Sequence, residues 1–182
     1  MRCTSINKII NCVIVFVIVF YISFNRTPIR YVDYDKDIIV CPCDGVVMNS
    51  NNRYISIFLS PLDVHAQYTP INSIIKSIRV IHGKAHMANT PASNHNAGVE
   101  VVFNSKFGDI VVTQRVGFLV RRIQNHININ EYVERGYNYG KINFGSRVDI
   151  ILPKGMKSIL KPDQRVYGGL TIISTDNIKN TI

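Results

Sequence analysis

The sequence predicts an all-β fold, a single sandwich- or barrel-like domain of short strands behind one N-terminal membrane helix. Ile, a residue that favours strands, occurs 28 times in 182 residues. The body of the chain consists of short apolar runs separated by turn residues, a spacing typical of β-sandwiches and barrels. The length suits one ordinary domain, and 46% apolar with 18% charged residues excludes a disordered or fibrous chain.

The first thirty residues contain the predicted membrane segment. Residues 9–24 read IINCVIVFVIVFYISF and carry no charge, with Lys8 before them and Arg26 after them. Sixteen helical residues span about 24 Å, and flanking side chains can extend this toward the roughly 30 Å of a bilayer core. The end of the run has no small-x-small motif for signal-peptide cleavage. We therefore expect residues 1–30 to be an uncleaved anchor with a basic flank, and peripheral attachment to the membrane surface is the alternative.

Residues 31–182 are predicted to form the β domain. Residues 31–37 (YVDYDKD) are polar and acidic, as in a linker. No fixed-period repeat or low-complexity tract interrupts the pattern that follows. The runs that predict strands are residues 38–41, 45–48, 54–59, 74–81, 99–103, 110–116, 118–123, 141–144, 148–152, 156–160 and 170–173.

The net charge of +9 favours an anionic partner, which is either nucleic acid or an anionic lipid surface. The basic residues are scattered and are not interleaved with the aromatic side chains that a single-strand nucleic-acid surface needs. Together with the anchor, this favours lipid, and we expect no nucleic-acid partner. Cys41 and Cys43 lack the second ligand pair of a zinc site, so no metal is expected.

Three short motifs stand out in the body. They are Cys41-Pro42-Cys43-Asp44-Gly45-Val46-Val47, Ile57-Phe58-Leu59-Ser60-Pro61-Leu62-Asp63-Val64-His65 and Phe144-Gly145-Ser146-Arg147-Val148-Asp149. Each alone has an ordinary explanation: an Asp-Gly turn before a strand, a histidine at a strand end, and a Gly-Ser turn between strands. An Asp, a His and a Ser scattered over a hundred residues do not by themselves define a catalytic set.

In this order, however, the motifs resemble the short form of the phosphatidylserine decarboxylase family, which includes archaetidylserine decarboxylases. Three further segments match that family and are residues 24–30 (FNRTPIR), 114–123 (QRVGFLVRRI) and 133–140 (VERGYNYG). There are two departures. Relatives have Asn-Glu-Arg-Asn where this chain has Asn94-His95-Asn96-Ala97, and longer members have a second histidine where this chain has Tyr68.

The resemblance implies a self-made pyruvoyl cofactor. Ser146 would attack the carbonyl of Gly145, and the chain would be cut into residues 1–145 and 146–182, which stay together through shared strands. Ser146 would become the pyruvoyl group and form a Schiff base with the amine of an anionic serine phospholipid, which would be decarboxylated from phosphatidylserine to phosphatidylethanolamine. His65 is the candidate proton donor. Asp44 is expected to orient His65 and raise its pKa, and Lys84 is a candidate phosphate contact.

Other interpretations stay open at this point. A homologue that does not cleave itself, acting as a membrane-anchored lipid-binding or structural β domain, is the main alternative, motivated by the departure at residues 94–97. A lipoyl-type carrier and a zinc hydrolase using His82, His86 and His95 are disfavoured because their motifs and spacings are missing. The sequence also leaves open whether His65 serves self-cleavage, decarboxylation or both, and whether the protein forms a homo-oligomer.

Overall fold

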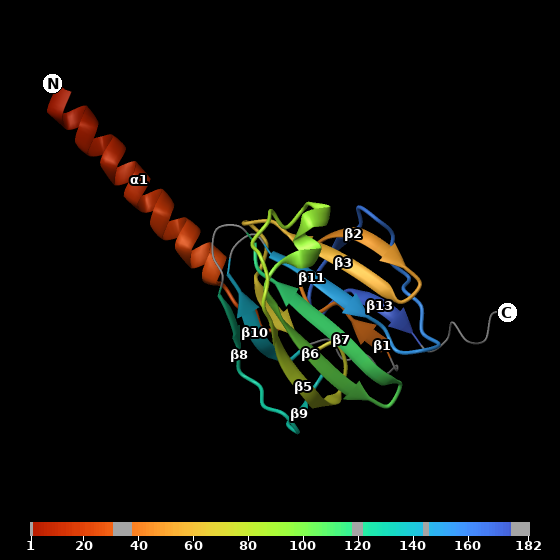
Figure 1. Ribbon diagram of the computed structural model, residues 1–182. Helices are drawn as coiled ribbons and strands as arrows, with labels where there is room; N and C mark the ends of the chain where they lie inside the picture. The colour runs from red at the N-terminus through yellow and green to blue at the C-terminus, as the bar shows by residue number, and fades with distance from the viewer. Residues whose placement is uncertain (1, 31–37, 118–121, 144–145, 176–182) are drawn as a thin grey trace.

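The computed structural model describes residues 2–30, 38–117, 122–143 and 146–175, with side chains from residue 6 onward. A single long helix projects from a β domain (Figure 1). The segment predicted as a linker, residues 31–37, lies outside the described residues, as do residues 118–121 of one expected strand.

The helix α1 (Arg2–Asn25) carries the predicted anchor. Its stretch Ile6–Asn25 has a mean hydropathy of 2.2 and is long and apolar enough to cross a membrane. Twenty residues of helix measure about 30 Å, the thickness of a bilayer core. Most of the apolar side chains before Phe24 are exposed; Phe16 and Tyr21, for example, are 70% and 68% exposed. Such a surface is unfavourable in water and favourable in lipid, which supports a membrane role for α1.

The domain is built almost entirely of strands, as predicted. A 3₁₀ turn, η1 (Pro91–His95), lies in the connection between β5 and β6. The strands are β1 (Ile38–Val40), β2 (Gly45–Asn51), β3 (Tyr54–Leu59), β4 (Ala66–Tyr68), β5 (Ser73–Ile81), β6 (Gly98–Ser105), β7 (Gly108–Arg115), β8 (Ile123–Asn125), β9 (Tyr132–Val133), β10 (Asn138–Ile142), β11 (Ser146–Ile151), β12 (Arg165–Val166) and β13 (Ile172–Thr175).

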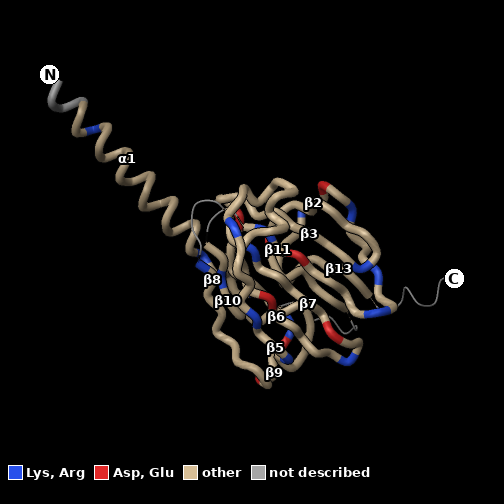
Figure 2. Tube along the Cα trace, viewed as in Figure 1, with Lys and Arg blue, Asp and Glu red and all other residues tan. Residues whose placement is uncertain are grey.

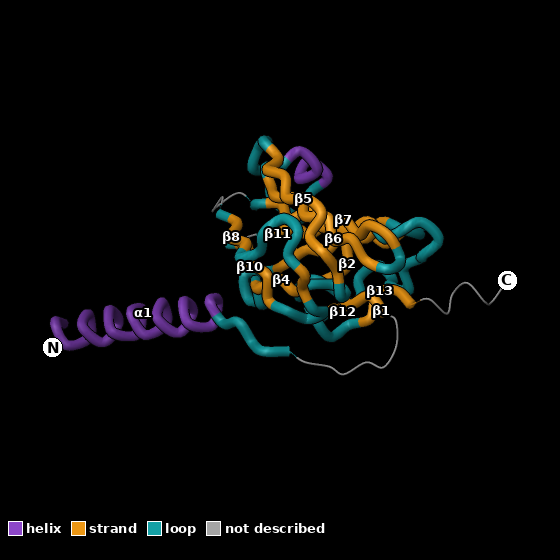
Figure 3. Tube along the Cα trace, turned by 90° about the horizontal axis from the view of Figure 1, so that it is seen from below, coloured by secondary structure: helices purple, strands orange, loops and turns teal. Residues whose placement is uncertain are grey.

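These strands form three sheets around one core. The large sheet has the order β12-β2-β3-β11-β7-β6-β5-β9, and the small sheets are β4-β10-β8 and β1-β13. Strands β12 and β9 end the large sheet without pairing with each other, so the arrangement is an open sandwich. Figure 3 shows β5, β6 and β7 on one side with β4, β1 and β13 on the other. Side chains from all three sheets, such as Val148, Ile142 and Ile39, share one buried cluster.

The sequence pattern missed the shortest elements. Strands β4, β9 and β12 have two or three residues, too few to show an apolar alternation. Residues 156–160, predicted as a strand, form none. Their apolar residues Met156 and Leu160 still face the core, but the preceding Gly155 turns the chain at a φ of +87°, which favours glycine. The run is apolar because Met156 and Leu160 are buried, although the segment is not part of any sheet.

The described strands after residue 145 pair with strands from the earlier part of the chain. Strand β11 lies in the middle of the large sheet between β3 and β7. Strand β12 pairs with β2, and β13 pairs with β1. Every described strand of residues 146–175 thus pairs with a strand that precedes it in the chain.

Candidate active site

Ser146 is the first residue of β11 and faces the core. Alternate residues of a strand face opposite sides of the sheet, so Ser146 shares its side with Val148 and Ile150, which are fully buried. The Ser146 hydroxyl is itself fully buried and has no hydrogen-bond partner among the described residues. A buried hydroxyl without a partner costs about 1–3 kcal/mol, and such groups in native proteins often mark function. Gly145, the expected acceptor, lies outside the described residues.

The other side of β11 carries a buried ion network. Arg147 Nε and Arg115 Nε donate to the two oxygens of Asp149, each over 2.7 Å. Tyr54 Oη accepts a bond from Arg147 Nη2 (2.6 Å) and donates to Asp149 Oδ1 (3.0 Å), and Arg147 Nη1 donates to Ser93 Oγ (2.7 Å). The network ties β3, β7, β11 and η1 together. Arg147 and Asp149 of the Phe-Gly-Ser-Arg-Val-Asp motif therefore fix the strand that presents Ser146.

The segment that departs from the family pattern is well packed. The Asn96 side chain is fully buried; its Nδ2 donates to the carbonyls of His86 and Val116, both at 2.8 Å. Its Oδ1 accepts from the His86 N–H (2.7 Å). A neutral amide whose polar atoms all have partners thus holds the loop before β6.

His65 is buried just before β4 with one ring nitrogen free. Its Nδ1 lies 2.9 Å from the carbonyl oxygen of Asp63, and because a carbonyl only accepts, Nδ1 carries the hydrogen. The Nε2 lone pair is buried without a partner in the described part of the chain. Burial lowers the pKa of His65, the Asp63 bond partly opposes this, and the charges of Lys141 and Arg26 lower it further. His65 is therefore a neutral base at pH 7, with Nε2 as the basic atom.

Asp44 is not where the sequence interpretation placed it. We expected it to orient His65 and raise the pKa of His65. Instead, both Asp44 oxygens accept bonds from Arg30, and Oδ1 also accepts the Gly168 N–H at 2.8 Å. No hydrogen bond joins Asp44 to His65 in the residues that the structure describes, and the pKa of His65 is lowered. The predicted contact between Asp44 and His65 was wrong, because the Asp44 carboxylate forms an ion pair with Arg30 instead.

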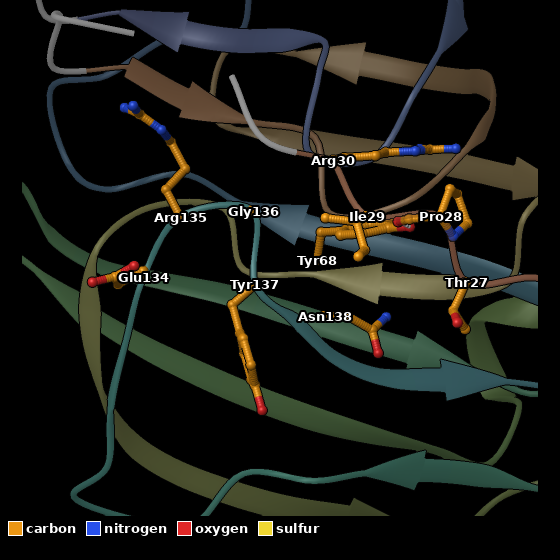
Figure 4. Close-up of a pocket in the computed structure, with 10 residues that line it drawn as sticks. All are labelled: Thr27, Pro28, Ile29, Arg30, Tyr68, Glu134, Arg135, Gly136, Tyr137 and Asn138. Carbon is orange, nitrogen blue, oxygen red and sulfur yellow. Dashed lines mark hydrogen bonds between the residues drawn. The ribbon is translucent and has the colours of Figure 1, made fainter. Parts of the chain in front are cut away.

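The Arg30–Asp44 pair fastens the segment after α1 to the domain, and Arg30 lies near Tyr68 in the cavity shown in Figure 4. The Arg30 guanidinium lies 5.1 Å from the centre of the Tyr68 ring and donates to the Gly168 carbonyl (2.8 Å). The Tyr68 hydroxyl donates to the Pro28 carbonyl (2.8 Å). Residues 27–30, Tyr68 and residues 134–138 line a cavity of about 410 Å³. Tyr68, where longer relatives have a second histidine, thus serves as a fastening point.

Two buried amides and one half-buried amide, which the sequence interpretation missed, each have a buried polar atom. Gln67, Gln114 and Asn125 form what we call the amide chamber, and each keeps one polar atom without a partner: Gln67 Oε1, Gln114 Nε2 and Asn125 Oδ1. In the small sheet, Gly140 pairs with both Gln67 and Asn125, so these two side chains share a face. The Ile142 N–H donates to the His65 carbonyl (3.1 Å), which extends this ladder by one residue and puts His65 on the same face as Gln67.

The chain segment that pairs with His65 lies close to Ser146 in the sequence. Ile142, the backbone partner of His65, lies four residues before Ser146, a distance of at most about 14 Å along the chain. The side chain of Ile142 is fully buried in the core that Val148 also enters. Of the three missed amides, only Gln114 could have been noticed in the sequence. It is the first residue of the segment 114–123, which resembles the family pattern.

The end of α1 packs directly on His65. The Phe24 ring is buried and lies 4.4 Å from the His65 ring, centre to centre. Lys141 Nζ lies 5.0 Å from the centre of the Phe24 ring and donates to Asn25 Oδ1. Figure 2 shows Lys and Arg positions on the part of the domain nearest to the end of α1. The candidate base therefore lies at the level where the apolar helix ends.

A second cavity, of about 490 Å³, opens beside this contact. Its apolar wall comes from α1, and its polar wall from the domain. The residues that line it are Val17, Phe20, Tyr21, Phe24, Asn25, Arg122, Gln124 and Asn143. Lys84, the expected phosphate contact, is not among them. It lies instead in a backbone bridge with Asn96.

Within the described residues, no group of three or more His, Cys, Asp or Glu side chains could hold a metal ion. The candidate site therefore consists of a buried serine, three amides and a neutral histidine that packs against the end of the apolar helix α1. Fold and site together describe a β protein with one long apolar helix and a buried serine that has no partner among the described residues, at the junction where the sequence predicts a cut.

Comparison with known proteins identifies the family. The family model for phosphatidylserine decarboxylase matches residues 17–174. A protein from Methanosarcina acetivorans, assigned as an archaetidylserine decarboxylase proenzyme, is 37% identical over 88% of this chain and 76% of its own length. The phosphatidylserine decarboxylase proenzyme of Chlorobium phaeobacteroides is 34% identical over 86% of this chain and 79% of its own length. The chain belongs to the phosphatidylserine decarboxylase family.

Proposed function

We propose that this protein is a membrane-anchored, pyruvoyl-dependent decarboxylase that converts a serine phospholipid, phosphatidylserine, to its ethanolamine counterpart, phosphatidylethanolamine. The observation that carries the proposal is the Ser146 hydroxyl, buried and unpartnered at the start of β11. Family membership supplies the class of reaction. The position of His65 against the end of α1 supports a substrate that arrives from the membrane.

Self-processing begins at Ser146 in this proposal. Its Oγ adds to the carbonyl carbon of Gly145 while the hydroxyl proton passes to a base, for which His65 Nε2 is the candidate. The proton then goes to the amide nitrogen of residue 146, the C–N bond breaks, and an ester joins the two residues. A base then removes the α-proton of residue 146 and the Cβ–Oγ bond breaks, which leaves a carboxylate on Gly145 and dehydroalanine at position 146. Water then releases ammonia and leaves the keto group.

The residues present fit a pyruvoyl group at position 146. The site is enclosed, and its free polar atoms in the described part of the chain belong to neutral side chains. When formed, this group supplies a carbonyl that reacts with the substrate amine and accepts the electrons of the bond to the departing carbon dioxide. His65 Nε2 would accept the proton that the substrate ammonium must lose before its amine reacts, and would return this proton to the former α-carbon of the substrate. Asp44 is proposed to act as a positioning residue, because its pair with Arg30 fixes the segment between α1 and the domain.

The cavity of about 490 Å³ beside α1 is the proposed place of the lipid. Its volume lies within the range of small-ligand sites. The apolar helix wall suits the acyl chains, and Arg122 suits the phosphate. Arg122, Arg26 and Lys141 form no ion pair with a carboxylate in the described residues, so their charges are available to an anionic lipid.

The two chains are proposed to stay together after cleavage. The strands β11, β12 and β13 would belong to the small chain, yet each pairs with a strand of the large chain. Side chains of the small chain also fill the common core: Val148, Ile150, Leu152, Met156, Leu160, Val166 and Ile173. Separation would expose this apolar surface to water, so the cut chains should copurify.

Release of carbon dioxide from a carboxyl-labelled serine phospholipid in mixed micelles tests the function. The wild type should release label, and Ser146→Ala should release none, because no hydroxyl remains to form the cofactor. Ser77→Ala, which removes a hydroxyl from the partly exposed strand β5, is the matched control and should behave as the wild type. A wild-type protein that binds serine phospholipid but remains uncut and releases no label would instead be a lipid-binding or structural homologue.

A further inference from the structure

We propose that the amide chamber, Gln67, Gln114 and Asn125, is the subsite for the amino and carboxylate groups of the serine headgroup. This inference rests on the proposed function and names the residues that recognise its substrate. Gln114 Nε2 donates to the carboxylate, and the Gln67 and Asn125 oxygens accept from the amine. All three side chains are buried or half-buried, and the atoms in question have no other partner in the described part of the chain.

Gln114 lies within reach of the reacting position. In the β7–β11 pair, Gln114 stands directly opposite Val148. It is therefore the diagonal neighbour of Ser146 on the same face, where Cβ atoms lie about 7–8 Å apart or slightly less and long side chains can meet. The full burial of both residues agrees with this shared face.

A hydrogen bond joins the Gln114 and Asn125 amides. Asn125 Nδ2 donates to Gln114 Oε1 over 3.0 Å, so the Nε2 donor is left free. Gly140, between Asn125 and Gln67 in the small sheet, makes room for the Asn125 amide: a Cβ there would lie 2.3 Å from Asn125 Oδ1. The chamber thus presents one oriented donor and two acceptors, the complement of an α-amino carboxylate.

A neutral hydrogen-bond donor such as Gln114 Nε2 is better suited than a cation to bind the substrate carboxylate, because this group leaves as carbon dioxide. During decarboxylation the negative charge leaves the carboxylate, so a cation there would stabilise the ground state more than the transition state. The nearby cations Arg115 and Arg147 are held on the opposite face of the sheet by Asp149. An amide can orient the carboxylate without this disadvantage.

Gln114→Glu is the sharpest test, because glutamate keeps the oxygen that accepts from Asn125 but replaces the donor with an anionic acceptor. In full-length protein, its KM for a serine phospholipid should rise by about ten- to a hundredfold, the size expected for one hydrogen bond to a charged group. The increase should shrink as the pH falls and the introduced carboxylate gains a proton that it can donate. The matched control is Gln164→Glu, in a turn where Gln164 Oε1 accepts the Lys161 N–H, and it should leave the KM unchanged.

A binding measurement separates this inference from the proposed chemistry. The uncut Ser146→Ala protein should bind glycerophosphoserine at least about tenfold more tightly than glycerophosphoethanolamine, which lacks the carboxylate. Adding Gln114→Glu should abolish that preference. An unchanged preference in the double variant, or none in Ser146→Ala, would overturn the assignment even if the wild type is an active enzyme. Conversely, a wild type that is never cut, with the preference intact, would remove the proposed function and leave the chamber as a serine-headgroup site.

Discussion

Replacing His65 with glutamine tests whether the free Nε2 atom is the base of self-cleavage. Glutamine can keep a donor toward the Asp63 carbonyl, which His65 Nδ1 contacts at 2.9 Å, but it has no basic nitrogen. A positioned general base contributes about 10²- to 10⁴-fold to a rate. Cleavage of His65→Gln should therefore slow by about that factor, and uncut precursor should accumulate as in Ser146→Ala.

The pH dependence follows from the same geometry. Burial lowers the pKa of His65, so the base is already neutral at pH 7. Cleavage should be constant above about pH 6.5 and should fall by about tenfold per unit below the pKa, because the protonated ring cannot accept a proton. The unfolded chain binds this proton more readily than the folded one, so folding stability should also fall as the pH drops through about 6.5 and below.

Cell-free synthesis followed by a pH jump, with the two chains separated on gels over time, measures these rates. His82→Gln, which changes an exposed histidine, is the control and should cleave like the wild type. Cleavage of His65→Gln at the wild-type rate would refute the role in maturation. If that variant also released carbon dioxide normally, His65 would have no part in the mechanism.

Three further predictions address the fold and the anchor. Asp44→Asn should lower the free energy of unfolding by about 3–5 kcal/mol in denaturant titrations, because it leaves Arg30 buried without its partner, and adding Arg30→Gln should restore part of the loss. Asp149→Asn should slow cleavage on gels, since Arg115 and Arg147 lose the carboxylate that fixes β11; normal cleavage would contradict this. Deletion of residues 1–26 should release a folded domain from membranes, with residual salt-sensitive binding to anionic vesicles in flotation assays, whereas an unfolded product would make the segment part of the core.

The class of fold could be predicted from the sequence because the long elements follow simple patterns. The apolar run of α1 is unbroken, and strands such as β3 and β5 have enough residues to show in the sequence. The run at residues 156–160 misled the prediction, because burial alone makes a segment apolar whether or not it finds a ladder partner. Pairing depends on chain segments distant in sequence, which local patterns do not encode.

The site was predicted in part, and the reason lies in which contacts are local. Ser146 and His65 were found through motifs, and both are buried with a free polar atom. The partner of Asp44 was predicted wrongly, since Arg30 is brought to it by the path of the chain after α1. Gln67 and Asn125 lie far apart in sequence and come together only through β10, so neither could be recognised before the sheet was known.

The intact mass of the purified protein tests the central claim most directly. The account predicts two chains, residues 1–145 with a free carboxylate and residues 146–182 with a pyruvoyl group in place of the amino-terminal serine, that copurify until denatured. Ser146→Ala should give one uncut chain of about 20.6 kDa, the mass of the whole sequence. A wild-type spectrum that shows only this intact chain would contradict the account.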